Sequence, residues 1–237
     1  MKHFKIQLLI CIFAVSSAAF SQSAEDYFKT GIEKSEQGNY TDAIINYNKA
    51  IELKSDYAEA YLYRGIAKSK LNDYNGEISD YNKAIELNSN YIDAYYNRGL
   101  AKSELEDYIG AISDFSKTIM LKPGDIEAYY SRGTCYYLTH KFDNAVTDFS
   151  IVISLDSNFS NAYLVRGLSY DMLGDYSKVI SDLTKRLELT NNDEEAYFYR
   201  GNAFKNSGSK NEACKDWQKA FSLGLQAAKD SLDVHCK

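Results

Sequence analysis

The chain has 237 residues, a formal net charge of −6 and a hydrophobic fraction of 45%. Its 27 basic residues are scattered among 33 acidic ones, which argues against binding to the phosphate backbone of a nucleic acid. Neither His140 nor His235 has a companion at metal-ligand spacing, and the common metalloprotease, phosphate-binding-loop and serine-hydrolase motifs do not occur. We therefore expect a protein that is not an enzyme and uses no cofactor.

The first 21 residues differ in character from the rest of the chain. Two lysines precede an apolar run over residues 6–15, and small residues predominate in 16–21. This order is typical of a secretory signal peptide, whose apolar run is too short to span a bilayer permanently. We expect residues 1–21 to be removed, which leaves a periplasmic or secreted chain with no integral membrane segment. Cys11 keeps lipid attachment open as an alternative, although Ile10 precedes it where a small residue is expected.

A glycine recurs every 34 residues through almost all of the remaining chain. The glycines are Gly31, Gly65, Gly99, Gly133, Gly167 and Gly201. All except the first follow an arginine. A fixed period of this length indicates stacked repeats rather than one globular core.

Other residue types keep fixed distances from each glycine. A tyrosine stands four residues before it, a large apolar residue sixteen after it, and a leucine twenty-two after it. These spacings predict two amphipathic helices joined by a tight turn, over residues 58–71 and 75–88 in the second unit. A glycine inside the first helix costs about 1 kcal/mol relative to alanine. We attribute it to close approach of the neighbouring helix backbone.

The pattern resembles the tetratricopeptide repeat family, which has the same period and similar small and large residues. The resemblance covers residues 24–227 and implies an all-α, right-handed α-solenoid of six helix-turn-helix repeats with a C-terminal capping helix. The expected segments are the signal peptide 1–21, the repeats 24–57, 58–91, 92–125, 126–159, 160–193 and 194–227, and the capping helix 225–237. The chain departs from the family where a proline usually closes the second helix, because only Pro123 occurs.

Three cysteines follow the signal peptide. Cys214 lies in the second helix of the last unit, and Cys236 lies in the last turn of the expected capping helix, one residue from its end. In an oxidising compartment a Cys214–Cys236 disulfide would fasten this helix to the array, and two free thiols are the alternative. We expect Cys135 to be a buried small apolar residue, with an intermolecular role left open.

An aspartate lies fifteen residues after each of the last five glycines, and buried arginines need such partners. We predict that each arginine pairs with the aspartate of the preceding unit. The predicted pairs are Arg98–Asp80, Arg132–Asp114, Arg166–Asp148 and Arg200–Asp182. A ladder of arginines that binds anions is the alternative.

The resemblance also implies a binding surface, because the first helices of the family line a concave groove. The matching positions in this sequence lie one or two turns around the first helix from its packing residues. They are Glu59, Leu62, Tyr63, Ile66, Asp93, Tyr96, Asn97, Leu100, Glu127, Tyr130, Ser131, Thr134, Leu164, Val165, Leu168, Glu195, Phe198, Tyr199 and Asn202. The recurrent acidic residue suggests a neutral or basic ligand. As an alternative, the tyrosines simply complete the packing.

We therefore expect a non-catalytic scaffold that binds a peptide or a partner protein in this groove, outside the cytoplasm. The set largely lacks the Lys, Arg and Asn residues with which some family members clamp a C-terminal carboxylate, which disfavours an adaptor for chaperone tails. The alternative is a module that binds a glycan or polymer of the cell envelope, where exposed tyrosines would stack on sugar rings.

Overall fold

The computed structural model describes residues 22–236, so the predicted signal peptide lies outside the described residues. The described residues form thirteen α-helices and no strand. The helices are α1 (Ala24–Glu36), α2 (Tyr40–Leu53), α3 (Ala58–Ser69), α4 (Tyr74–Leu87), α5 (Ile92–Glu104), α6 (Tyr108–Leu121), α7 (Ile126–Leu138), α8 (Phe142–Leu155), α9 (Ser160–Met172), α10 (Tyr176–Leu189), α11 (Glu194–Asn206), α12 (Lys210–Ser222) and α13 (Ala227–His235). None of these helices is long and apolar enough to span a membrane.

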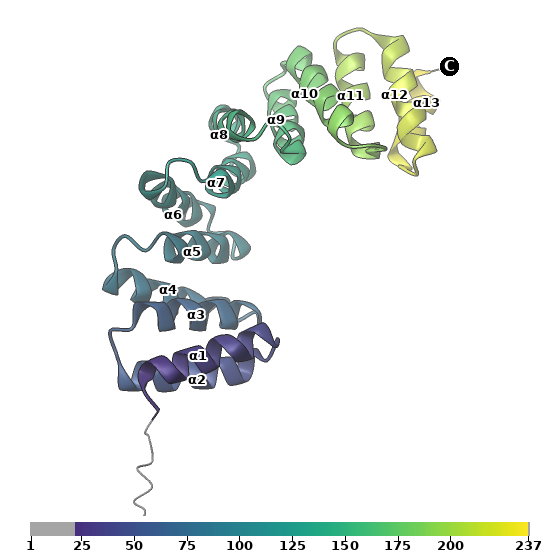
Figure 1. Ribbon diagram of the computed structural model, residues 1–237. Coiled ribbons are helices and arrows are strands. Elements are labelled where there is room, and N and C mark those ends of the chain that lie inside the picture. Colours follow the sequence, from purple (N-terminus) through teal and green to yellow (C-terminus); the bar gives the residue numbers. More distant parts are fainter. Residues whose placement is uncertain (1–21, 237) are drawn as a thin grey trace, which may run out of the picture.

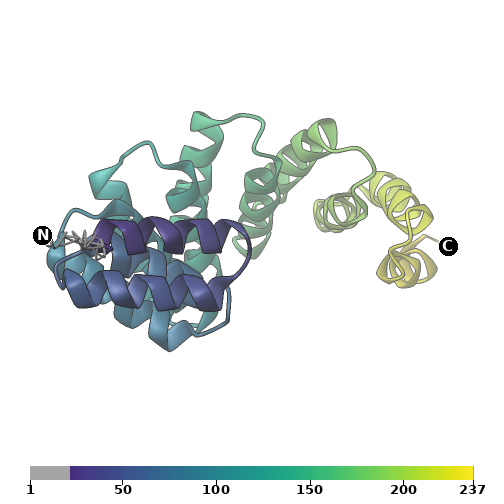
Figure 2. The same ribbon diagram turned by 60° about the horizontal axis from the view of Figure 1, so that its bottom comes forward.

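The first twelve helices form six pairs, and each helix packs against the next one along the chain. The pairs follow one another in a curved array that runs from α1 to α13 (Figure 1). In a second view the first pairs overlap one another and the last pairs extend away from them to one side (Figure 2). This arrangement confirms the predicted all-α solenoid, in which α13 packs against α12 at the C-terminal end.

The turn inside each pair contains one residue in the left-handed backbone region, seven positions after the repeated glycine. This residue is Gly38, Asn72, Glu106, His140, Gly174 or Gly208. In four units the next side chain caps the second helix; Asp107, for example, accepts a hydrogen bond from the backbone N–H of Gly110 at 2.9 Å. His140 therefore has a structural role, because with a φ of 59° it is the left-handed residue of its turn.

Glu77 is an acidic residue at a position that small apolar side chains fill in the other five units. Only 2% of its surface is exposed. The hydroxyl of Tyr81 donates a hydrogen bond to Glu77 Oε2 at 3.3 Å. Burial raises the pKa of Glu77, because the desolvated carboxylate is disfavoured relative to the neutral acid. The next unit has Ala111 and Phe115 at these two positions, so Glu77 supplies the acceptor that the buried hydroxyl of Tyr81 needs.

A disulfide joins Cys214 on α12 to Cys236 behind α13, with the two Cα atoms 5.8 Å apart. The predicted pairing is confirmed in the structure. The bonded cap covers an apolar cluster around Trp217 and Ala220, to which Leu232 also contributes. Cys135 is a free thiol with 1% of its surface exposed, in agreement with its predicted role as a buried apolar residue.

The repeated glycine makes room for a side chain of the second helix in the same pair. A Cβ atom at Gly99 would lie 2.7 Å from Phe115 Cε1, and one at Gly65 would lie 2.5 Å from Tyr81 Cε1. The close neighbour is thus the ring sixteen residues on, and the backbone explanation that we drew from the sequence is wrong for these two glycines. In the fifth unit this ring is replaced by Leu183, and a Cβ atom at Gly167 would meet nothing closer than 3.5 Å.

This contrast predicts opposite effects of the same substitution in two units. Gly99→Ala should lower the free energy of unfolding by about 1–3 kcal/mol, because the ring of Phe115 must move. Gly167→Ala should raise it by up to about 1 kcal/mol, because alanine is the better helix former and fits without a clash. Urea denaturation of the two variants measures both effects. Equal effects would contradict a role of the ring in selecting glycine.

Candidate functional site

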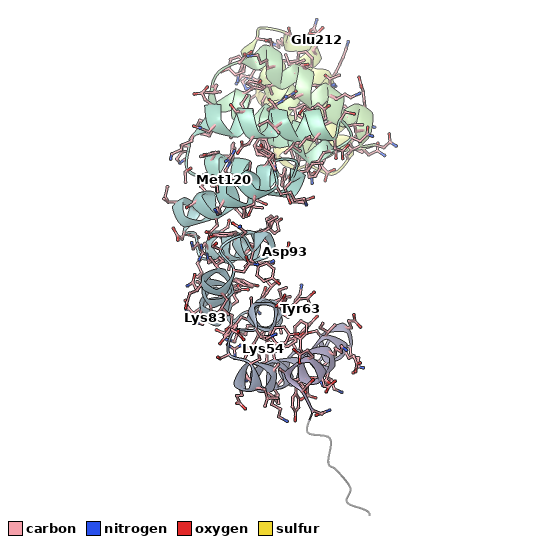
Figure 3. All side chains as sticks on the ribbon, turned by 60° about the vertical axis from the view of Figure 1, so that its left-hand side comes forward. Lys54, Tyr63, Lys83, Asp93, Met120 and Glu212 are labelled. Carbon is pink, nitrogen blue, oxygen red and sulfur yellow. A yellow bond between two sulfur atoms is a disulfide. The ribbon has the colours of Figure 1, made fainter. Side chains whose placement is uncertain are left out.

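The first helix of each pair lies on the inner side of the curved array. α1 contacts α3, and each later first helix contacts the next one through α11, whereas successive second helices make no comparable contacts within residues 22–236. First helices are therefore more closely spaced, as expected on a concave face. Tyr63 on α3 and Asp93 on α5 project from this side, and Lys83 and Met120 project from the opposite side (Figure 3).

The predicted groove residues differ in their exposure on this face. The exposed members are Glu59, Tyr63, Asp93, Leu100, Glu127 and Glu195. Twelve others are half-buried. Leu62 is only 3% exposed and packs with Tyr81 and Ala84, so its prediction as a groove residue is corrected to a core residue.

The groove tyrosines take part in packing as well as in the surface. The rings of Tyr96 and Phe115 lie 5.7 Å apart, and those of Tyr130 and Phe149 are equally close. Burial raises the pKa of Tyr96 above its ordinary value, because the desolvated phenolate is disfavoured relative to the neutral hydroxyl. Each of these two rings thus packs one face against the core and leaves part of its surface accessible. The two tyrosines therefore complete the packing and also contribute to the surface of the inner face.

Some polar groove residues are already engaged within the array. Asn202 Oδ1 accepts a hydrogen bond from Trp217 Nε1 at 3.0 Å. Asn97 Nδ2 donates to the carbonyl of Asp93 at 2.7 Å, and Thr134 donates to the carbonyl of Tyr130 at 2.9 Å. These groups have less hydrogen-bonding capacity left for a ligand. The carboxylates of Asp93 and Glu127 make no ion pair within residues 22–236.

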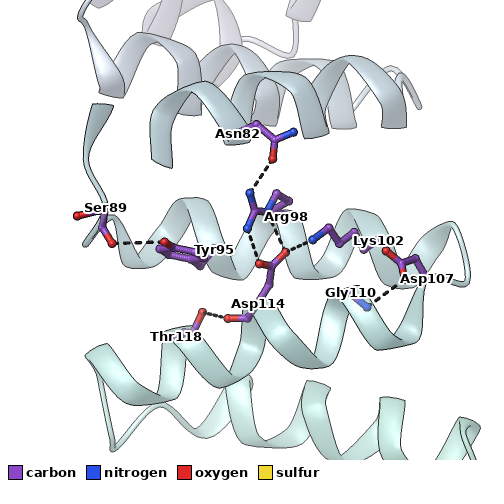
Figure 4. A network of polar contacts seen from close by, with 9 residues as sticks. All are labelled: Asn82, Ser89, Tyr95, Arg98, Lys102, Asp107, Gly110, Asp114 and Thr118. Carbon is purple, nitrogen blue, oxygen red and sulfur yellow. Dashed lines mark hydrogen bonds and ion pairs between the residues drawn. The ribbon is translucent and has the colours of Figure 1, made fainter. Parts of the chain in front are cut away.

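Each repeated arginine binds the aspartate sixteen residues further on, in the second helix of its own pair. Arg98 donates from Nε to Asp114 Oδ2 at 2.9 Å and from Nη2 to Asp114 Oδ1 at 2.5 Å (Figure 4). The predicted partner, Asp80 of the preceding unit, binds Arg64 instead. The correction applies throughout, because Arg132, Arg166 and Arg200 likewise pair within their own units. The observed pairs are Arg132–Asp148, Arg166–Asp182 and Arg200–Asp216.

The contact with the preceding unit exists, but it is made to a neutral side chain. Nη1 of Arg98 donates to Asn82 Oδ1 at 2.6 Å, and Nη1 of Arg132 donates to Ser116 Oγ at 3.0 Å. The other repeated arginines bind Asn48, Ser150 and Thr184 in the same way. One guanidinium therefore links three helices. Hydrogen bonding to Asp148 raises the pKa of Arg132. This arginine therefore keeps its charge and cannot transfer a proton as a general acid.

The surroundings of the ion pair change along the array. In the second and third units a lysine also contacts the aspartate, with Lys68 Nζ 2.8 Å from Asp80 and Lys102 Nζ 2.7 Å from Asp114. The three later units have a ring at the lysine position, and the guanidinium lies over it. These rings are Tyr136, Tyr170 and Phe204. A ring over a cation contributes a weaker attraction than a second charge at the carboxylate.

These pairs determine which charges remain free on the inner face. Every Lys and Arg of α3, α5, α7 and α9 contacts a second-helix aspartate. The acidic residues near the start of the first helices, such as Glu59 and Asp93, are exposed. The side-chain charges of α3, α5 and α7 that form no ion pair within residues 22–236 are thus acidic. Asp80 on α4 and Asp114 on α6 each contact two of the cations of these helices. An anion-binding ladder of arginines is disfavoured, because their donors are engaged.

Two pockets open on the face of the first helices. One, of about 370 Å³, lies at the start of α5 and α7, and its walls are Ile92, Asp93, Tyr96, Lys122, Gly124, Asp125, Ile126 and Glu127. The other, of about 330 Å³, lies between the first two units and is lined by Ile32, Ser35, Glu36, Tyr40, Tyr63, Ile66 and Lys70. Both include predicted groove residues. The sequence pattern missed the loop contributors Lys122, Gly124 and Asp125, which lie outside the helical register.

Residues 22–236 contain no cluster of His, Cys, Asp or Glu able to hold a metal ion. The pockets instead combine apolar walls with a few charged groups at the rim. Such an arrangement suits the side chains of a bound segment.

Comparison with known proteins identifies the repeats. Residues 34–72 and 67–105 match a model described as TPR repeat, and residues 92–125 match one described as tetratricopeptide repeat. The chain therefore contains tetratricopeptide repeats and folds as a solenoid of that type. No curated protein matches the chain.

Solved structures share this fold. A MamA protein is 25% identical, with a TM-score of 0.69, over 74% of this chain and 96% of that chain. YrrB, described as a TPR protein with an unusual peptide-binding site, is 21% identical, with a TM-score of 0.73, over 79% of this chain and 97% of that chain. A tetratricopeptide repeat protein from Parabacteroides merdae is 22% identical, with a TM-score of 0.61, over 93% of this chain and 87% of that chain.

The two kinds of ion-pair surroundings predict unequal effects of losing the arginine. Arg132→Ala should lower the free energy of unfolding by about 3 kcal/mol, because Asp148 stays buried and forms no other ion pair within residues 22–236. Arg98→Ala should have a clearly smaller effect, because Lys102 still contacts Asp114. Urea denaturation of both variants provides the comparison. A larger loss for Arg98→Ala would show that the lysine does not compensate.

Proposed function

We propose that this chain is a non-catalytic scaffold that binds a segment of a peptide or partner protein along the inner face formed by its first helices. The observation that carries the proposal is the pair of pockets on this face, whose walls include Tyr63, Ile66 and Tyr96 from predicted groove positions. Partly exposed aromatic and aliphatic side chains beside a pocket are typical anchors for a partner. The MamA and YrrB structures support the scaffold fold, and YrrB is described as binding a peptide.

We further propose that the scaffold acts outside the cytoplasm. Two observations support this location: the signal-like residues 1–21 in the sequence, and the disulfide between Cys214 and Cys236. Disulfides persist in oxidising compartments and are rare in the cytosol.

A glycan ligand is the second candidate. Stacking on sugar rings needs aromatic faces that are open to solvent. Among the groove tyrosines only Tyr63 is exposed, while Tyr96 and Tyr130 pack on core rings. The inner face therefore favours a peptide over a glycan.

The test is selection of random twelve-residue peptides displayed on phage against residues 22–237, followed by affinity measurement with synthetic copies of the recovered peptides. Tyr63→Ser and Leu100→Ser should each weaken binding roughly tenfold, because each removes an exposed apolar anchor from the inner face.

Ile109→Ser and Met120→Ser are matched controls, because both residues are exposed and apolar but belong to the second helix of a pair. They should leave the affinity unchanged. Binding that depends on the control residues would place the site elsewhere. Recovery of no peptide, together with sedimentation of the protein on insoluble cell-wall glycan, would favour the second candidate.

A further inference from the structure

The pocket at the start of α5 and α7 contains two carboxylates that form no ion pair with any residue of the described chain. Asp93 and Glu127 are exposed at its walls. Its other charged groups neutralise each other, since Lys122 Nζ lies 2.9 Å from Asp125 Oδ2. Asp125 is also engaged as a helix cap and accepts the backbone N–H of Ala128 at 3.0 Å. The unbalanced charge of the pocket therefore comes from Asp93 and Glu127.

The remaining walls are apolar. Ile92 and Ile126 stand at the first positions of α5 and α7, and Tyr96 presents the accessible part of a ring whose other side packs on Phe115. The pocket thus combines apolar walls with acidic groups. Lysine and arginine side chains complement both, because each has an aliphatic stem and a cationic end that stays near water. A tyrosine ring beside the stem also attracts the cation through its π face.

The ion pairs of the array direct the cations of α5 and α7 away from this pocket, which leaves Lys122 as the cation in its wall. The cations of α5 and α7 are Arg98, Lys102 and Arg132, and all three contact Asp114 or Asp148. They are thus directed toward the second helices rather than toward Asp93 and Glu127. The position of these two carboxylates in the first turn of a helix also has a structural reason, because the helix dipole stabilises acidic groups there.

We propose that this pocket between α5 and α7 binds a lysine or arginine side chain of the segment held in the groove, with the aliphatic stem against Ile92, Ile126 and Tyr96 and the cation beside Asp93 and Glu127. The inference rests on the proposed function, because it names the chemistry of the ligand that the inner face takes.

The experiment uses the phage-displayed twelve-residue library on residues 22–237 and on the variant Asp93→Asn/Glu127→Gln. Lysine and arginine should be enriched among peptides recovered on the unsubstituted chain and not on the variant. A synthetic copy of one enriched peptide should bind the variant roughly three- to tenfold more weakly, the range expected for the loss of two exposed charge pairs. Raising NaCl from about 50 mM to about 300 mM should remove most of this difference, because salt screens exposed charges.

The matched control is Glu52→Gln/Asp113→Asn, which removes two exposed carboxylates from second helices and leaves the pocket intact. It should bind the peptide like the unsubstituted chain. Recovered peptides without lysine or arginine enrichment, or equal weakening in the variant and the control, would overturn the cation pocket and leave the peptide scaffold standing. Recovery of no peptide on any of the three proteins would overturn both proposals.

Discussion

The guanidinium of the repeated arginine holds the array together at the same place in five units. Its Nε and Nη2 donors bind both oxygens of an aspartate in the second helix of the same pair, and its Nη1 donor reaches the second helix of the pair before it. The aspartates are buried, with 2–6% of their surface exposed. A buried carboxylate without a cation is strongly destabilising, so the position of the arginine constrains both helices that surround it.

This constraint shapes the surface that remains for a ligand. Because the cations of α3, α5, α7 and α9 are directed at aspartates, the inner face retains exposed carboxylates at the starts of several first helices. The glycine beside each arginine has a separate role, since it admits a ring of the second helix in most units. Structural positions and proposed binding positions thus lie on the same helix. Repeated positions hold the array, and positions such as Leu100 and Thr134, which differ from unit to unit, are the ones proposed to contact a ligand.

Much of the fold could be predicted from the sequence, because the 34-residue period repeats the same two helices and fixes the place of each turn. The aspartate that pairs with each arginine could not be predicted from the sequence. Arg98 has one aspartate eighteen residues before it and another sixteen residues after it, and the period is compatible with both. Only the three-dimensional packing places Asp114, and not Asp80, against the guanidinium.

The candidate site was less accessible to sequence reasoning. Leu62 occupies the same repeat position as Tyr96, yet the shorter side chain is buried and the longer one reaches the surface. The pocket beside Tyr96 also takes Lys122 and Asp125 from a connection between units, where no helical register applies. Leu164 shares the residue type and the repeat position of Leu62 but is only half-buried. Local packing and loop geometry therefore decide these details, and a repeat pattern contains neither.

A double-mutant cycle on Arg166 and Asp182 tests the central role of the ion pair most directly. The fifth unit suits this measurement because the structure places no lysine at Asp182, so the cycle isolates one arginine and one carboxylate. The free energies of unfolding of Arg166→Ala, Asp182→Ala and the double variant should be strongly non-additive, with a coupling energy of about 2 kcal/mol. Additive losses, within about 0.5 kcal/mol, would contradict the account, because they would show that the two side chains stabilise the array independently.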